Sequence, residues 1–416
     1  MVSHAGLYSS GISLRHLKAM LYVVDNKSVT RAANKLNRSQ TTITKAISEL
    51  ESSLDTRLFD RTSTGMAPTV YGEVLSRRVR MVVDEFCKAG AAYQEYRPQG
   101  RPHQSIAVFS LDISHKRLEA LVAIYEERDI TAAAHILGLS KTAVYNSLRY
   151  IEELLDLPLF QREPHGVTPT GLASTLVGHI KLAFSQIDQA LDDIANLNGV
   201  TQGRVVIGTL PYTRTYLVPV AINRLLQDYP QIDVVTHGGA YNVLESSLRC
   251  GDVDFIIGAL RDTRDRADIV TEALLEDRLS VIARKGHPLS DREKLELKDL
   301  QDANWVLPAR GSPSWQLFDE TLNTHNMSIP AHAVETSSLS MVRGLLLDSD
   351  RVALLSKHQI YFDVQFGILD ALPVEIDGTD RPIGITQRSH TKPSPAAELF
   401  LGYLRQVAVE VRNQSV

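Results

Sequence analysis

The chain lacks several features that would assign it to other classes of protein. Among its 416 residues are only two cysteines, Cys87 and Cys250, too few for a disulfide framework. Its net charge is −5, so any basic surface for nucleic acid must be local. The longest apolar runs, such as Val253–Leu260, are too short to span a bilayer, and Met1–Ser13 has no basic start followed by an apolar run. We therefore expect a soluble cytoplasmic protein without a signal peptide or a membrane segment.

Motifs of metal and catalytic sites are also missing. The 13 histidines are scattered, without an H-E-x-x-H motif or paired Cys/His spacing for a metal. The sequence has neither a G-x-S-x-G nucleophile elbow nor a phosphate-binding loop. We therefore expect no enzyme, no metal and no other cofactor.

What the chain does contain is a long internal repeat. A shift of 101 residues aligns Leu14–Gly72 with His115–Ala173, and 17 of the 59 paired positions are identical. Leu58–Thr69 (LFDRTSTGMAPT) and Leu159–Thr170 (LFQREPHGVTPT) share the frame L-F-x-R, then a glycine, then P-T. A repeat of this length indicates a duplicated domain, and two copies are too few for a solenoid.

Each copy has the pattern of three short helices followed by a wing. In the first copy, Thr30 is expected to cap the second helix, and Ser39 caps a third helix over Gln40–Leu54. A second helix, a tight turn and a third helix with one polar face form a helix-turn-helix, whose third helix lies in the major groove of DNA. Leu58–Thr69 then falls where a wing would be, with Arg61 directed at a phosphate.

The first copy closely resembles the N-terminal winged helix-turn-helix of LysR-type transcriptional regulators. The resemblance covers Leu14–Gly72 and rests on S-V-T-R-A-A, S-Q, I-x-x-L-E and L-F-x-R occurring together. It departs at Thr41, where the family frequently has proline, and the second copy departs further, with Lys141 at the glutamine position. The resemblance implies DNA contact by Arg31, Ser39, Gln40, Thr41, Thr44, Lys45 and Arg61, and in the second copy by Lys141, Thr142, Tyr145, Asn146 and Arg162.

The two copies differ in charge. Residues 14–72 hold nine Lys and Arg against five Asp and Glu, whereas residues 115–173 hold six against eight. Because neutralised phosphates supply most of the sequence-independent affinity for DNA, the first copy is predicted to be the stronger DNA binder. The second copy either contacts DNA as well or has become a module for protein contact and oligomerisation, and the sequence leaves both open.

A long helix follows each copy, over residues 73–97 and 174–198. Apolar residues alternate spacings of three and four along Ala173–Leu197, and the same phase holds 101 residues earlier along Gly72–Tyr96. Such a heptad seam predicts pairing with another helix. In the family this helix is the dimerising linker, which implies a homodimer or homotetramer. Packing of each seam against its own domain is the alternative.

In residues 203–411 strand and helix patterns alternate, which indicates an α/β domain with a largely parallel sheet. The pattern resembles the family's effector domain, a two-lobed fold like periplasmic binding proteins. We expect one lobe at about 203–285 and 378–411 and the other at about 286–377, with Gly286–Pro288 as the crossing. The predicted fold class is therefore α + α/β, with two winged helix-turn-helix units and long linker helices before the effector domain.

Ligands in such folds bind in the cleft, at the carboxyl ends of strands and the N-termini of helices. The resemblance to the family implies that the effector is a small organic acid, aromatic acids included, or a sugar. Arg310 and the amides of the helix start that follows it favour an anion. For each serine and threonine, helix capping is the competing explanation, and both roles can coexist. The candidate effector contacts are Tyr212, Thr213, Gly239, Tyr241, Arg310, Ser312, Ser314, Thr336, Ser337 and Ser338.

Together these features predict a regulator of transcription that binds promoter DNA and a small-molecule effector, with contact to RNA polymerase as a further expectation. A small-molecule receptor without a DNA function conflicts with the intact, basic first copy. No membrane partner is expected.

Overall fold

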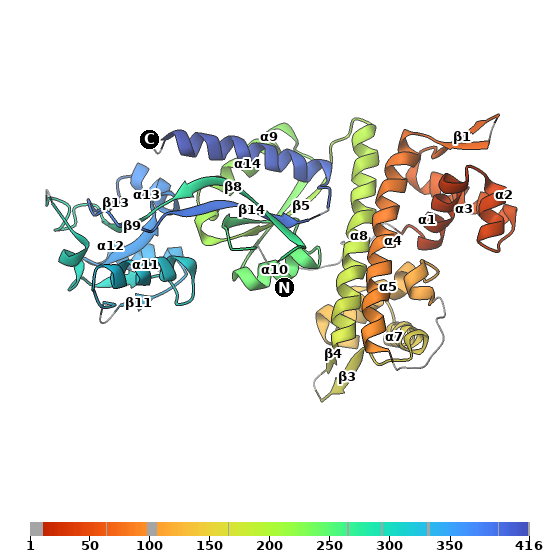
Figure 1. Cartoon of the computed structure of the whole chain (residues 1–416), viewed down its shortest axis with the longest axis horizontal. Coiled ribbons are helices and arrows are strands. Elements are labelled where there is room, and N and C mark those ends of the chain that lie inside the picture. Colours follow the sequence, from red (N-terminus) through yellow and green to blue (C-terminus); the bar gives the residue numbers. More distant parts are fainter. Residues whose placement is uncertain are drawn as a thin grey trace. The chain divides into compact units, whose positions relative to one another are not determined.

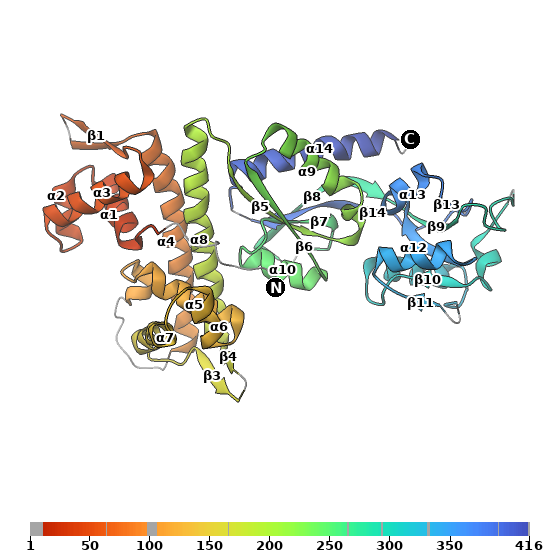
Figure 2. The ribbon, with the colours of Figure 1, turned by 180° about the vertical axis from the view of Figure 1, so that it is seen from behind.

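The computed structural model describes residues 11–63, 65–97, 106–164, 166–263, 266–292, 294–330, 333–389 and 391–414. The chain divides into two compact units: the first runs to Gly203 and also includes Cys250–Asp252, and the second comprises Arg204–Arg249 and the chain from Val253 onward. Figures 1 and 2 show their elements from opposite sides. Among the described residues, no helix is both long and apolar enough to cross a bilayer.

The first unit contains the two copies of the repeat, and both fold as winged helix-turn-helices. In each copy three helices precede a two-stranded antiparallel wing, and the two wings share one register, with Phe59 opposite Pro68 and Phe160 opposite Pro169. The duplication predicted from the sequence is therefore confirmed. The elements of the first copy are α1 (Leu14–Asn26), α2 (Val29–Lys35), α3 (Gln40–Leu54), β1 (Phe59–Thr62) and β2 (Gly65–Pro68); those of the second are α5 (His115–Glu127), α6 (Ile130–Ile136), α7 (Lys141–Leu155), β3 (Phe160–Glu163) and β4 (Gly166–Pro169).

Helix α2 begins earlier than predicted. Its N-cap is Ser28, whose hydroxyl accepts a hydrogen bond from the backbone N–H of Arg31 at 3.3 Å, so Thr30 lies inside the first turn and is not the cap. Serine and threonine are both favoured caps, and the extended backbone of Ser28 decides between them. Ser39 caps α3 as predicted, accepting from the N–H of Thr42 at 3.2 Å.

Residues that are identical in the two copies attach the wing to the helices. One carboxylate oxygen of Glu51 accepts from the N–H of Leu58 at 2.7 Å, and Glu152 does the same for Leu159. Gly65 has a φ of 134°, and a side chain there would place its Cβ 2.3 Å from the carbonyl oxygen of Lys27. Both copies of the repeat therefore keep glycine at the point where the wing passes against the end of the first helix.

The two linker helices, α4 (Val70–Tyr96) and α8 (Gly171–Leu197), lie side by side and antiparallel (Figure 1). Tyr71 at the start of α4 bonds to Asn198 just beyond the end of α8, and Glu85 in α4 meets His179 in α8. The heptad seams are buried except at their last positions, Tyr96 and Leu197. The seams were predicted to pair with another helix, and the partner of each is the other linker helix of the same chain.

The second unit is a two-lobed α/β domain with one five-stranded sheet in each lobe. The first sheet has the order β6-β5-β7-β14-β8, and β14 runs antiparallel to both of its neighbours, β7 and β8. This sheet is therefore mixed rather than largely parallel, because β14 enters it on the way back from the other lobe. Helices α9 and α14 cover one face and α10 the other (Figure 2). The elements of this lobe are β5 (Gly203–Thr209), α9 (Leu217–Asp228), β6 (Ile232–Gly238), α10 (Tyr241–Arg249), β7 (Phe255–Ala259), β8 (Ile269–Asp277), β14 (Arg381–Arg388) and α14 (Pro395–Gln414).

The second lobe has the sheet order β11-β10-β12-β9-β13. Helix α11 packs on one face of this sheet and α12 on the other. The elements of this lobe are β9 (Leu279–Arg284), β10 (Trp305–Leu307), α11 (Pro313–Thr324), β11 (Val334–Glu335), α12 (Leu339–Leu347), β12 (Val352–Ser356), α13 (Tyr361–Gln365) and β13 (Leu369–Ala371).

The first crossing between the lobes differs from the prediction. Strand β9 pairs with β12 of the second lobe, so the chain crosses at Arg278, between β8 and β9, and not near Gly286. The prediction of a first-lobe segment reaching residue 285 is wrong because β9 continues β8 almost without a break. His287 is buried in a turn of the second lobe, where its Nδ1 accepts from the N–H of Leu289 at 3.1 Å.

Candidate DNA-binding surface and effector pocket

The recognition helix of the first copy, α3, separates an apolar side from a polar one. Ile43, Ala46, Ile47 and Leu50 are buried in the core of the first unit. The hydroxyl of Ser39 is engaged as the helix cap, and Gln40 accepts a hydrogen bond from Thr30 at 3.3 Å. All the predicted DNA contacts of this copy are exposed, namely Arg31, Ser39, Gln40, Thr41, Thr44, Lys45 and Arg61.

The recognition helix of the second copy, α7, has a similar exposed face with one added contact. Lys141, Thr142 and Asn146 are exposed, as is Arg162 on the wing. Arg162 donates to the hydroxyl of the half-buried Tyr145 at 2.9 Å, and its guanidinium carbon lies 5.5 Å from the centre of that ring. The wing arginine of the second copy is thus hydrogen-bonded to its recognition helix. The equivalent of Tyr145 in the first copy is Thr44, which has a much shorter side chain.

Glu163, the acidic neighbour of Arg162, is engaged within the wing. Its carboxylate accepts a hydrogen bond from the hydroxyl of Thr168 on the facing strand at 2.6 Å. The carboxylate of Glu163 is therefore hydrogen-bonded to a neutral hydroxyl of the wing.

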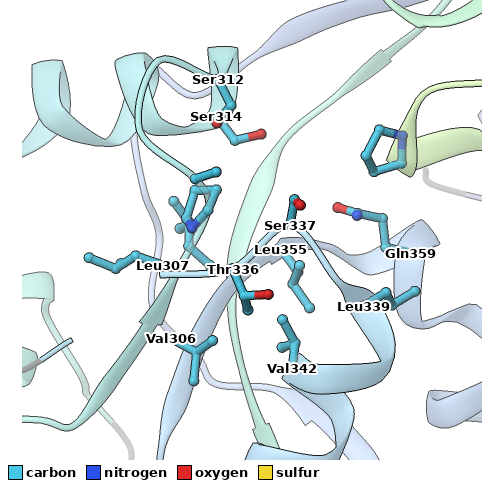
Figure 3. Close-up of a pocket in the computed structure, with 14 residues that line it drawn as sticks. Val306, Leu307, Ser312, Ser314, Thr336, Ser337, Leu339, Val342, Leu355 and Gln359 are labelled. Atoms are coloured by element: carbon cyan, nitrogen blue, oxygen red, sulfur yellow. The ribbon is translucent and has the colours of Figure 1, made fainter. Parts of the chain in front are cut away.

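A pocket opens in the second unit where the lobes meet (Figure 3). It encloses about 590 Å³, including its open mouth, and is bounded by the ends of β10 and β12, the N-terminal ends of α11 and α12, and Pro211 of the first lobe. The lining comprises Pro211, Val306, Leu307, Pro308, Ala309, Ser312, Ser314, Thr336, Ser337, Leu339, Val342, Leu354, Leu355 and Gln359.

A chain of buried hydrogen bonds connects the lobes beside this pocket. Arg381, at the start of β14, donates to the hydroxyl of Ser314 on α11 at 2.5 Å. The same guanidinium donates twice to one carboxylate oxygen of Asp277, at 3.0 and 2.9 Å. The other oxygen of Asp277 accepts from the hydroxyl of Ser356 at 2.5 Å. Two residues of the first lobe are thereby bonded to two residues of the second.

Burial controls the protonation of the groups near this chain of bonds. It raises the pKa of Tyr212, and the charge of Asp277 raises it further, so the phenol is neutral and able to donate. Burial also lowers the pKa of His358, whose ring centre lies 5.8 Å from that of Tyr212. Within the part of the chain that the structure describes, the buried Tyr212 hydroxyl has no hydrogen-bond partner. An unpaired buried hydroxyl costs roughly 1–3 kcal/mol of stability.

The structure gathers only some of the predicted effector contacts in the pocket. Ser312, Ser314, Thr336 and Ser337 line it, and Ser312 also caps α11 by accepting from the N–H of Trp315 at 3.2 Å. Capping and pocket lining therefore coexist at Ser312.

The other predicted contacts lie outside the pocket lining. Thr213 is buried and donates to the carbonyl oxygens of Leu210 and Ile257 at 3.1 Å, which holds the turn after β5. Ser338 caps α12, and the exposed Arg310 pairs with Glu335 at 2.7 Å. Tyr212 is buried and does not line the pocket, whereas on the first lobe Gly239 follows β6 and Tyr241 begins α10.

Sequence reasoning missed Gln359 and the Ser314–Arg381–Asp277–Ser356 chain. Gln359 lies in the short helical turn after β12, where its side-chain oxygen accepts from the N–H of Ser356 at 3.2 Å. Arg381 follows no glycine-rich turn or helix start, and its partners lie 67 and 104 residues away. No local pattern in the sequence marks such residues.

Comparison with known proteins follows the same division of the chain. A family model described as the LysR substrate binding domain matches residues 198–409, and one described as the bacterial regulatory helix-turn-helix protein of the lysR family matches twice, at 14–73 and 115–173. The chain belongs to the LysR family. Members of this family are DNA-binding transcriptional regulators and not enzymes; they bind small-molecule effectors and form oligomers.

Two curated relatives differ in how much of this LysR-type regulator they match. The HTH-type transcriptional regulator GalR of Pseudomonas putida is 36% identical over 398 residues, which cover 96% of this chain and 98% of GalR. The regulator PcaQ of Agrobacterium fabrum is 27% identical over 299 residues, 72% of this chain and 96% of PcaQ. The match to GalR thus spans nearly the whole chain, whereas the match to PcaQ leaves out more than a quarter of it.

Solved structures of two family members share the fold. A full-length variant of OxyR from Pseudomonas aeruginosa has a TM-score of 0.52 at 19% identity and covers 74% of this chain and 95% of its own. CbnR, a LysR family transcriptional regulator, has a TM-score of 0.52 at 16% identity and covers 71% of this chain and 99% of its own. The predicted fold class is confirmed by these likenesses.

Proposed function

We propose that this LysR-type regulator acts in the cytoplasm and is controlled by a small organic acid bound in the pocket between its lobes. The observation that carries the proposal is the pocket itself, where the N-terminal ends of α11 and α12 converge beside the Ser314–Arg381 bond. Backbone N–H groups at helix N-termini attract a carboxylate. The rest of the lining is largely apolar and suits the body of a small molecule.

The expected ligand carries little charge. No lysine or arginine is among the described residues that line the pocket, and Arg381 is already bound to Asp277 behind Ser314. One carboxylate can be held by helix N-termini and hydroxyls, whereas two would need a cation in contact. The ligand class is therefore a monocarboxylic acid with an apolar body.

Control of DNA binding follows from the position of the pocket. Pro211 contributes from the first lobe and the remaining lining from the second, so a ligand that touches both changes the relative stability of open and closed lobes. A ligand acts only through its different affinities for those two states. We infer that the closed state changes how the regulator holds its DNA.

Two neighbouring serines provide a test of the effector site. Ser337 lines the pocket, as Figure 3 shows, whereas Ser338 caps α12 outside the lining. A panel of small monocarboxylic acids is screened by thermal shift, and hits are titrated by calorimetry. Ser337→Ala is expected to weaken binding by about two- to tenfold. Ser338→Ala is expected to lower stability by about 1 kcal/mol and keep the affinity. No response to any acid, or equal loss of affinity in both variants, contradicts the proposed site.

We further propose that both copies of the winged helix-turn-helix contact DNA. The exposed Lys141, Thr142 and Asn146 on α7 support this for the second copy, because such side chains bind phosphates and base edges. The two recognition faces carry different residues, so the two halves of the bound site are expected to differ in sequence.

Equivalent positions in the repeat provide the test of both copies. Footprints are compared for the wild type, for Gln40→Ala with Lys45→Ala, and for Lys141→Ala with Asn146→Ala. We expect each pair to remove protection from one part of the site. An unchanged footprint in the second pair, with intact oligomers, would favour the alternative in which the second copy contacts only protein, such as RNA polymerase. If both double variants keep the wild-type footprint, DNA recognition by these helices is contradicted.

A further inference from the structure

The contact between the two linker helices contains a buried charge. The side chain of Arg78 on α4 is 4% exposed. It donates to the carboxylate of Asp193 at 2.8 Å, to Gln186 at 3.0 Å and to Gln189 at 2.7 Å. All three of these partners lie on α8. A buried charge is stable only when it is paired and hydrogen-bonded, so Arg78 requires the α8 sequence beside it.

The repeat indicates what Arg78 would meet if α4 paired with α4 of a second copy. The residues 101 positions before Gln186, Gln189 and Asp193 are Glu85, Lys88 and Ala92. In such a pair Glu85 would stand in place of Gln186, Lys88 in place of Gln189, and Ala92 in place of Asp193. Arg78 would then face a lysine in place of one amide and a methyl group in place of its carboxylate partner. The position equivalent to Arg78 in α8 is His179, which instead pairs with Glu85 at 2.8 Å.

Asp193, the carboxylate that Arg78 binds, lies across the α4–α8 contact and not on α4. Lys88 does not compete for it, because Lys88 pairs on its own helix with Asp84 at 2.7 Å and Glu85 at 2.9 Å. Two copies of α4 would place Ala92 where Asp193 now lies, and two copies of α8 would bring two Asp193 carboxylates together without Arg78. Polar and charged residues in a helix seam select partners in this way, by penalising the wrong pairs.

Residues just before the second copy contact the first copy and its linker helix. The ring of Phe109 packs 5.5 Å from that of Tyr93 on α4. Lys18 on α1 donates to the carboxylate of Asp112 at 2.6 Å. Because these contacts hold the start of the second copy beside α4, they raise the effective concentration of α8 at α4 of the same chain.

We propose that the buried cluster of Arg78 with Gln186, Gln189 and Asp193 makes α4 select α8 of its own chain. One chain then brings its two winged helix-turn-helices together by itself. Pairing of α4 with α4, or of α8 with α8, would require two chains. The linker seam is then covered, and a second copy of the chain associates through other surfaces. This inference concerns helix pairing and does not depend on whether the second copy contacts DNA.

Disulfide trapping in the full-length protein tests the proposal. Cys87→Ser and Cys250→Ser remove the native thiols, and Glu85→Cys with His179→Cys places a thiol on each helix at a point of contact. Under mild oxidation we expect a disulfide within one chain, seen as a monomer of altered mobility on a non-reducing gel. A covalent dimer as the main product would overturn the proposal.

Charge reversal in the same cysteine background tests the role of Arg78. Arg78→Glu is expected to slow formation of the disulfide within the chain by about tenfold or more, because it places a second carboxylate beside Asp193. Combining it with Asp193→Arg restores the opposite charges and is expected to restore the rate. Arg80→Glu is the matched control, because Arg80 lies on the same helix and pairs with Asp25 at an exposed position. A wild-type rate for Arg78→Glu, or no rescue by the double reversal in a folded protein, would show that Arg78 does not select the partner.

Discussion

Two ion pairs where the strands cross between the lobes allow a sharp test of what holds the effector domain together. The pair Asp277–Arg381 is buried, with side chains 2% and 10% exposed, whereas the adjacent pair Arg278–Asp380 is 52% exposed on both sides. Asp277→Asn keeps the shape of the side chain but leaves the guanidinium of Arg381 without its carboxylate. Removing one partner of a buried pair costs about 3–5 kcal/mol. With a urea dependence of about 1–3 kcal/mol per molar, the unfolding midpoint is expected to fall by about 1–5 M.

The assay follows from the placement of the tryptophans. The chain has two, Trp305 and Trp315, and both lie in the second lobe, so tryptophan fluorescence of the full-length protein reports on the effector domain. Asp380→Asn is the matched control, and its midpoint is expected to change little because the exposed pair is screened by solvent. Equal midpoints for the two variants would refute the reasoning that burial makes the Asp277 pair important.

Three further predictions concern the first unit. Burial and the nearby Asp192 raise the pKa of Asp188 to about 7, so ionising Asp188 destabilises the fold as the pH rises from about 4 to about 7. Asp188→Asn should therefore raise the melting temperature at pH 8, by about 2–4 °C, and leave it unchanged at pH 4, as thermal unfolding followed by circular dichroism can check. Arg61→Ala should weaken DNA binding at all sequences and reduce the slope of affinity against salt by about one, measured by fluorescence anisotropy, whereas Arg162→Ala should do less because Tyr145 holds that guanidinium. Gly65→Ala should destabilise the first wing by about 1–3 kcal/mol in chemical unfolding, because its Cβ would meet a backbone carbonyl at 2.3 Å.

Local patterns in the sequence were sufficient to predict the winged helix-turn-helices and insufficient to predict the pocket. A helix-turn-helix depends on residues a few positions apart, so the face of α3 with Gln40 and Lys45 follows from helical spacing alone. The pocket depends on residues brought together from four separate segments. Ser312 and Thr336 were found because helix starts have a recognisable pattern, whereas Gln359 and Arg381 have none. Predicting their place requires knowing how two lobes meet.

By itself, the sequence determined that a winged helix-turn-helix occurs twice and that each copy is followed by a helix with a heptad seam. It could not decide what covers those seams, because an apolar stripe packs equally well against any helix of matching period. Only the tertiary structure decided that α4 and α8 of one chain cover each other, with Arg78 placed against Asp193. The physical reason is that partner choice depends on which charges meet across the contact, and that is a property of the three-dimensional register.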